Sequence, residues 1–221
     1  MIAINDFMEL VRQTNALTNK ENEEDLCQLV KNYANLEQVM DWLNGLVECN
    51  NEEQTLKLAS LMELHPLGFE KYVIWNDNFD GPRMRLHYWP ENKWPFESIH
   101  DHRFNFCSTI LCGSYTHETY NVKQGNGNHV ELELTGSTLM KKGDVYYFPA
   151  GMFHRVLPSD EMTLSLIIRS EAILPYSRVV DPSTKILRNA FGAKNKFIER
   201  ISNLTQQLSK TKSGLISGGG N

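Results

Sequence analysis

The chain has 221 residues, 41% of them hydrophobic, with a formal net charge of −5 and an isoelectric point near 5.8. This suffices for one domain with a sizeable core plus appendages. Lys and Arg form no dense cluster, which argues against a nucleic-acid partner, and no apolar run approaches the ~20 residues of a membrane span. The first six residues lack the features of a signal peptide, so we expect a cytoplasmic protein with free cysteines.

Residues 2–64 have the apolar spacing of helices. Apolar side chains recur every three to four positions over 4–11 and 26–36, and a third helix is expected over 37–47. The polar residues 50–53 interrupt this pattern and are expected to cap the start of a further helix that continues to Leu64. No catalytic signature occurs here, so these residues are expected to form a helical layer on a barrel or on a second subunit.

The helix-breaking residues 65–68 separate this helical segment from a strand-rich region. Many short strands with frequent turns favour a closed or double-sheet β architecture. After Pro182 the helical period returns, first over 186–191 and then over 197–208, and the glycine-rich tail is expected to be mobile. The strands are expected at 69–76, 82–89, 103–112, 114–122, 129–135, 137–140, 145–149, 153–158, 162–170 and 175–180.

Two separate stretches carry the candidate chemistry. His100 and His102 occupy positions i and i+2 beside a run of strand-forming residues, so both imidazoles are expected on one face. Pro149 and Gly151 form a turn that delivers His154 onto a following strand. Neutral imidazole suits Zn, Cu, Fe and Ni, so these three histidines are predicted to be the ligands of a metal ion.

At these residues the sequence resembles the cupin superfamily, whose two motifs are H-x-H-x3–4-E-x6-G and G-x5-P-x-G-x2-H-x3-N. The resemblance implies a mainly β fold with flanking helices, organised as an N-terminal helical segment (1–66), a cupin jelly-roll barrel (67–181), a C-terminal helical segment (182–212) and a flexible tail (213–221). The matching residues are His100, His102 and Gly113 for the first motif, and Gly143, Pro149, Gly151 and His154 for the second.

The sequence departs from both motifs at one position each. The glutamate is replaced by Phe106, or by Cys107 in the longer register, and the closing asparagine is Pro158. A metal would therefore be held by three histidines, with more positions open to substrate, as in catalytic sites.

The run from Ser98 to His102, with Cys107 five positions further on, resembles the thiol (cysteine-type) dioxygenases, which implies Fe(II). The residues that bind the substrate carboxylate in those enzymes are absent: Ile74 stands where an Arg is expected, and Ile167, Arg169 and Glu171 stand where a Ser/His/Tyr set is expected. The metal ligands thus carry over, but the substrate-binding residues do not.

Several other residues are candidates for substrate binding or catalysis. Arg85 shares a strand face with His87 and Trp89 that lines either the barrel mouth or an outer surface, and Arg169 alternates inward on a later strand. Either guanidinium could hold a carboxylate. Cys107 is a redox thiol, a support for the metal ligands, or a small buried hydrophobe.

The residues flanking the motifs offer further ligands and ion pairs. His117 or Glu118 could add a fourth ligand or a base, although a surface position is the simpler interpretation. Asp101 should point away from the metal, and Arg103 and Arg155 should pair with acids between the sheets.

The leading hypothesis is a metal-dependent cupin enzyme, a non-haem Fe(II) oxygenase acting on a small anionic or thiol-containing metabolite. One alternative is a Zn, Ni or Mn lyase, isomerase or hydrolase, and another is a non-enzymatic sensor or binding module. Exposed apolar stripes on residues 37–64 or 186–208 would favour a partner, and a homodimer is considered on that ground.

Overall fold

The computed structural model describes residues 1–49, 51–64, 69–78, 81–90, 98–192, 197–198 and 200–206. Within these residues, no helix is long and apolar enough to cross a membrane. Asn51 caps a helix start within 50–53, as the sequence predicts, by accepting a hydrogen bond from the Gln54 N–H, and Asn35 caps another by accepting one from the Gln38 N–H. The helices before the barrel are α1 (Ile4–Gln13), the 3-10 helix η1 (Lys20–Asn22), α2 (Glu23–Tyr33), α3 (Leu36–Glu48) and α4 (Glu52–Ala59).

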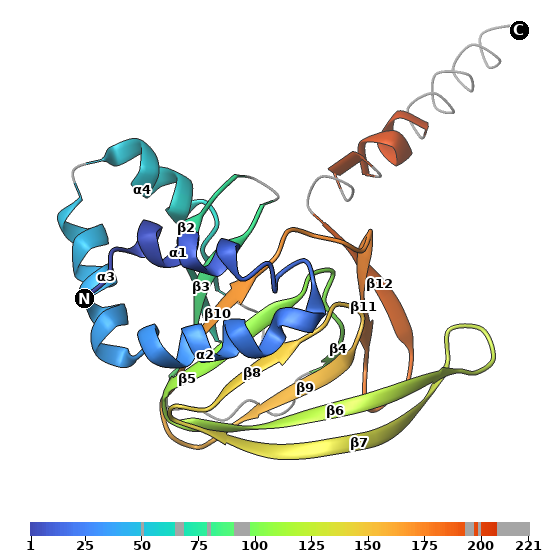
Figure 1. Cartoon of the computed structure of the whole chain (residues 1–221). Helices are drawn as coiled ribbons and strands as arrows, with labels where there is room; N and C mark the ends of the chain where they lie inside the picture. The colour runs from blue at the N-terminus through green and yellow to red at the C-terminus, as the bar shows by residue number, and fades with distance from the viewer. Residues whose placement is uncertain are drawn as a thin grey trace, which may run out of the picture.

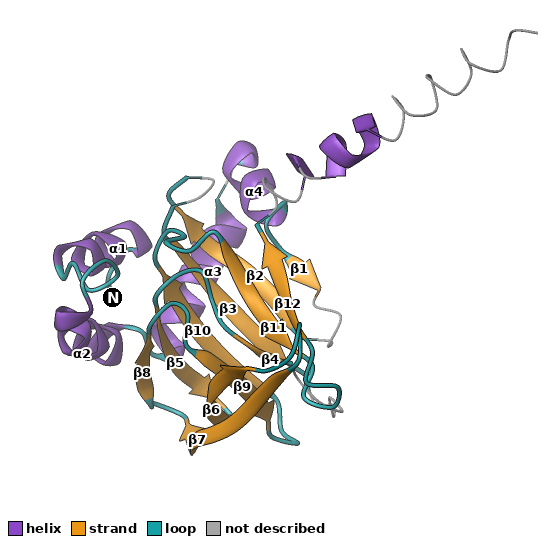
Figure 2. Cartoon of the chain, turned by 90° about the vertical axis from the view of Figure 1, so that its right-hand side faces the viewer, coloured by secondary structure: helices purple, strands orange, loops and turns teal. Residues whose placement is uncertain are grey.

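Two antiparallel sheets face one another, as a jelly roll requires (Figures 1 and 2). The first has the order β1-β2-β3-β10-β5-β8, and the second has the order β12-β11-β4-β9-β6-β7. The strands are β1 (Glu63–Leu64), β2 (Glu70–Asn76), β3 (Arg83–Trp89), β4 (Ile99–His100), β5 (Phe106–Cys112), β6 (Ser114–Gln124), β7 (Val130–Lys141), β8 (Val145–Phe148), β9 (Phe153–Pro158), β10 (Thr163–Arg169), β11 (Tyr176–Val180) and β12 (Leu187–Phe191).

The first sheet separates the main core from the interior of the barrel. Its outer face packs against the helices: Met84 and Leu86 of β3 share a buried cluster with Phe7, Leu26 and Trp42. Burying a side chain of this size contributes about 1.5–3 kcal/mol. The alternate residues of β3 point between the sheets, which confirms the two-face interpretation of this strand.

The N-terminal helices and the expected strands are present with shifted ends, and the helix expected to continue to Leu64 ends at Ala59. The segments expected at 129–135 and 137–140 form the single strand β7, which has a register shift after its Gly136–Thr119 pair. The two-residue strands β1 and β4 were not expected.

The prediction of a helix over 186–191 is wrong. Residues 187–191 form β12, which pairs with β11 from Val180–Leu187 to Tyr176–Phe191. The turn between β11 and β12 includes Lys185, whose φ is 55. Hydrogen bonds between the two strands pair the backbone N–H and C=O groups that a helix would otherwise pair. Helical structure resumes at 197–198 and 200–206. The expected breaker at 65–68 and the tail at 213–221 lie outside the described residues.

Candidate metal centre

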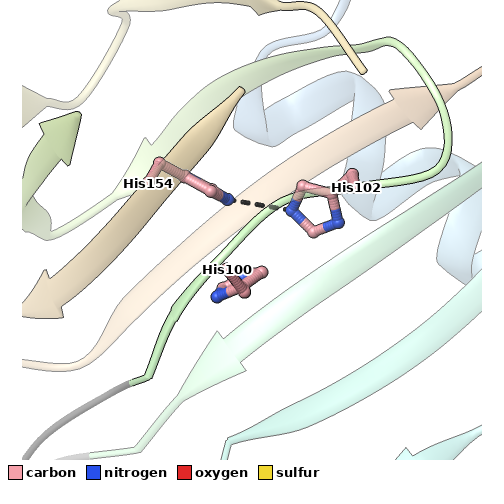
Figure 3. A group of neighbouring side chains, drawn as sticks. All are labelled: His100, His102 and His154. Atoms are coloured by element: carbon pink, nitrogen blue, oxygen red, sulfur yellow. Dashed lines mark hydrogen bonds between the residues drawn. The ribbon is translucent and has the colours of Figure 1, made fainter. Parts of the chain in front are cut away.

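Three histidines converge on the inner face of the second sheet (Figure 3). His100 lies on β4 directly opposite His154 of β9, and His102 follows β4 in the chain. One ligand nitrogen from each residue lies within 4.8 Å of the other two. The sequence prediction that these three side chains come together is therefore confirmed.

The turn before β9 places His154 through a backbone that glycine adopts readily. Gly151 has φ 79, and its N–H donates a 3.0 Å hydrogen bond to the carbonyl of His102. This bond ties the two histidine-bearing segments together.

Hydrogen bonds select the tautomers of two of the histidines. The Nδ1 of His100 lies 3.0 Å from the carbonyl oxygen of Ser98, which only accepts, so Nδ1 carries the proton and Nε2 keeps a lone pair. The Nδ1 of His154 lies 2.8 Å from the Nε2 of His117. Such partners orient metal-binding imidazoles and fix the nitrogen that faces the metal.

The electrostatic environment keeps His102 and His154 neutral, which is the form that binds metals. Desolvation, reinforced by the neighbouring His100, lowers the pKa of His102 and His154 well below the usual value. Desolvation also lowers the pKa of His117 to about 4, so its ring is neutral at neutral pH and has one nitrogen free to accept a hydrogen bond from the Nδ1–H tautomer of His154.

The donor set fits a first-row metal ion. The Nε2 atoms of His102 and His154 lie 2.9 Å apart. Two imidazoles bound at about 2.1 Å in adjacent octahedral positions would hold their nitrogens about 3.0 Å apart. All three ligand nitrogens lie within 4.8 Å of one another, so His100, His102 and His154 would hold the ion once their side chains close around it.

The histidines line a cavity of about 230 Å3 between the sheets. Its aromatic wall consists of Phe69, Trp89, Phe106, Tyr115 and Tyr146, and the Tyr115 and Tyr146 hydroxyls lie 2.9 Å apart. Trp89 and Phe106 thus form part of the apolar wall of the cavity.

The side of the cavity formed by the first sheet also carries basic residues. Lys71 and Arg85 line the cavity, whereas its one carboxylate, Asp101, is engaged by Arg178 at 2.6 Å. The buried Nε of Arg85 and the buried Oγ of Ser165 have no hydrogen-bond partner among the described residues. Desolvation and the charge of Arg83 lower the pKa of Arg85 to about 10, so its guanidinium stays protonated at neutral pH. This wall is suited to a small anion.

Arg169, the second predicted anion-binding residue, does not line the cavity. Its Nη1 donates a 2.8 Å hydrogen bond to the Ser170 carbonyl, and its guanidinium lies 4.6 Å from the ring centre of Phe104. Phe104 in turn stacks on His102, with ring centres 5.0 Å apart. Arg169 therefore supports the wall behind a metal ligand.

The expectation that Cys107 lies beside the metal is wrong. Its side chain is fully buried on the helix-facing side of β5, with its Sγ 3.9 Å from the Sγ of Cys27 on α2. Phe106 points into the barrel, and strand alternation turns the next residue away. Burial and the contact with Cys27 raise the pKa of Cys107, so its thiol stays protonated.

The surface interpretation of His117 is also wrong, because the residue is 7% exposed and contacts His154. The Glu118 side chain points to the other face of the strand and accepts hydrogen bonds from Arg155 and Tyr120. Arg155 thus pairs with an acidic residue, as expected. Neither His117 nor Glu118 belongs to the group of nearby metal-binding atoms.

Asp101 was expected to point away from the metal, and its carboxylate instead lies buried, paired with Arg178. Sequence reasoning also missed the cavity positions of Lys71, Tyr115, Tyr146 and Ser165. In the sequence these residues alternate with core residues, and this pattern was the available evidence for their position. The pattern did not show which face of the strand lay toward the second sheet.

The facing antiparallel sheets and the histidine cluster agree with the architecture that the sequence resemblance to cupins implies. No protein-family model and no curated protein matches the sequence, but solved structures do. An RmlC-like cupin protein from Ralstonia eutropha JMP134 matches with a TM-score of 0.38 and 15% identity, over 66% of this chain and 81% of that one.

Two enzymes with cupin-type structures also match. DMSP lyase DddQ from Ruegeria pomeroyi DSS-3 has a TM-score of 0.34 and 16% identity, over 46% of each chain. Oxalate decarboxylase from Bacillus subtilis has a TM-score of 0.36 and 12% identity, over 57% of this chain and 29% of that one. The chain thus spans less than half of either enzyme, and at these identities the likeness concerns the fold alone.

Proposed function

We propose that the protein is a metal-dependent enzyme, a non-haem Fe(II) oxygenase that acts on a small anionic metabolite. The observation that carries this proposal is the convergence of three imidazoles on a cavity whose opposite wall holds the Arg85 guanidinium. An Fe(II) ion held by the three histidines would supply redox chemistry and open positions for O2 and substrate.

The residues around the ion would bind and orient the substrate. The Nε of Arg85 and the hydroxyl of Ser165 would donate hydrogen bonds to its anionic group. A cavity of about 230 Å3 lies below the usual range of ligand pockets, so the substrate would be small. The aromatic wall would exclude water, which strengthens the charge pairing with Arg85.

The cysteines favour a reducing compartment. Among the described residues, Cys27, Cys49, Cys107 and Cys112 are all free thiols. We therefore place the enzyme in the cytoplasm. Its substrate would be a carboxylate or a thiol-containing acid, because a thiolate is a good ligand for Fe(II) and Arg85 would pair with the carboxylate.

The experiment is O2 uptake after anaerobic loading of the full chain with Fe(II). We expect slow O2 consumption that a panel of small carboxylic acids and thiol acids stimulates, and no stimulation in His154→Ala. The matched control is His129→Ala, which changes an exposed histidine far from the cluster. Tight iron binding with no O2 consumption across the panel would contradict the oxygenase proposal.

A second candidate is a Zn, Ni or Mn lyase, isomerase or hydrolase, and the pair of tyrosine hydroxyls favours it. Burial and the neighbouring Tyr115 raise the pKa of Tyr146, so its hydroxyl stays protonated and would donate a hydrogen bond to an oxygen of a substrate in the cavity. Activity with Zn or Mn that Tyr146→Phe abolishes, without O2 consumption, would select this candidate.

A further inference from the structure

An apolar groove of about 620 Å3 lies on the helical side of the molecule, away from the histidine cavity. It runs between α3, α4 and the outer face of the first sheet, and its lining includes Leu46, Leu58, Tyr72 and Tyr88. Large side chains remain exposed along it: Val47 is 86% exposed and Met62 is 45% exposed. None of the residues of α4 is buried, so this helix covers the sheet incompletely. The groove is therefore an unfilled apolar surface.

A second apolar surface lies on the helical segment 197–206. Every described residue of this segment is exposed. Phe197, Ile201 and Leu204 follow one another at helical spacing and form a single stripe, with exposed fractions of 66%, 46% and 49%. Isolated helices of this length are marginal in water, so the segment requires a partner for its apolar face.

The helix and the groove belong to opposite ends of the chain, in segments whose sequences have opposite charge; Arg200 lies in the described part of the helix, and the other charged residues of its segment lie outside the described residues. Residues 36–63 contain six acidic residues and one basic residue, namely Glu37, Asp41, Glu48, Glu52, Glu53 and Glu63 against Lys57. Residues 192–212 contain five basic residues and one acidic residue, namely Lys194, Lys196, Arg200, Lys210 and Lys212 against Glu199. Complementary charge of this kind steers association and fixes orientation.

The helix follows β12, at the edge of the second sheet, and runs away from the body of its own chain in both views (Figures 1 and 2). Occupying its own groove would require the helix to turn back over the first sheet. A second copy requires no such rearrangement. A twofold arrangement would also fill both grooves with both helices at once, because its interface uses the same patches on each subunit.

The geometry points to a homodimer in which the C-terminal helix of each copy docks its Phe197, Ile201 and Leu204 stripe in the α3–α4 groove of the other. This is helix-in-groove recognition, with anchors at i, i+4 and i+7. It does not depend on the metal or on the proposed reaction.

A native thiol allows a direct test on the full chain. Cys49 is exposed and lines the groove. In Ile201→Cys, mild oxidation should give a disulfide-linked dimer on a non-reducing gel, and adding Cys49→Ser should abolish it. A link within one chain, a dimer that persists without Cys49, or no link at all would each overturn the proposal.

The matched pair of substitutions is Phe197→Asp, on the stripe, and Asn203→Asp, on the opposite side of the same helix. Both residues are exposed, so neither change should affect folding of the barrel. We expect light scattering after gel filtration to show a dimer for the wild type and Asn203→Asp. Phe197→Asp should weaken dimerisation more than about tenfold. A wild-type monomer at tens of micromolar, or equal dimerisation of the two variants, would contradict the docking.

Discussion

The Nδ1 of His154 lies 2.8 Å from the Nε2 of His117 on the neighbouring strand β6. This contact makes His117 a positioning residue for a metal ligand, although it is not a ligand itself. The contact also explains why a histidine stands at a buried position beside Tyr146, where an apolar residue would fit equally well.

His117→Phe should lower metal affinity about 10–100-fold, because it removes the acceptor that orients His154. Competition with a fluorescent chelator measures this affinity. His117→Gln keeps a hydrogen-bond acceptor and should recover most of the loss. If His117→Phe bound metal as tightly as the wild type, the positioning role would be wrong.

Arg85→Met should weaken the binding of small carboxylates about tenfold or more without changing metal content. The buried Nε of Arg85 has no hydrogen-bond partner in the part of the chain that the structure describes, so the free energy of unfolding should stay the same or rise. Calorimetric titration and thermal melting measure the two effects. Equal carboxylate affinity in Arg85→Met and the wild type would show that Arg85 does not bind the carboxylate.

Arg169→Ala should act on stability rather than on anion binding. Its guanidinium packs over Phe104 and donates to the Ser170 carbonyl, so its loss should lower the free energy of unfolding by about 1–3 kcal/mol. Urea denaturation measures this change. A selective loss of carboxylate affinity at unchanged stability would show that Arg169 takes part in anion binding.

Asp101→Ala should loosen the metal centre by releasing the segment that carries both His100 and His102. The Asp101 carboxylate is buried and binds the Nε and the backbone N–H of Arg178 on β11. Its loss leaves these donors without an acceptor, at a cost of about 2–4 kcal/mol. Thermal melting should show the loss, and the chelator assay should show weaker metal binding. Unchanged melting would contradict this role.

Local patterns in the sequence predicted most of the fold. Alternation placed Arg85 and His87 on one face of β3 and Leu86 on the other, and the two motifs brought three histidines together from segments some fifty residues apart. Each of these inferences needs only the periodicity of a strand or the geometry of a turn.

The failures came from tertiary context. The residues between His102 and β5 are not in a strand, so counting from His102 gave no information about the face on which Cys107 lies. The apolar spacing of 186–191 suits a helix. The edge of β11, however, has backbone groups that need hydrogen-bond partners, and this segment pairs with them as β12. His117 carried no motif, so only its contact with His154 revealed its role.

The most direct test of the central claim is the metal content of the protein purified without a metal-affinity step. We predict near-stoichiometric first-row metal in the wild type and in the surface control His129→Ala, and little tightly bound metal in His154→Ala, because only two ligands would remain. Undiminished metal in His154→Ala, or none in the wild type after reconstitution with Fe(II), would contradict a metal centre formed by His100, His102 and His154.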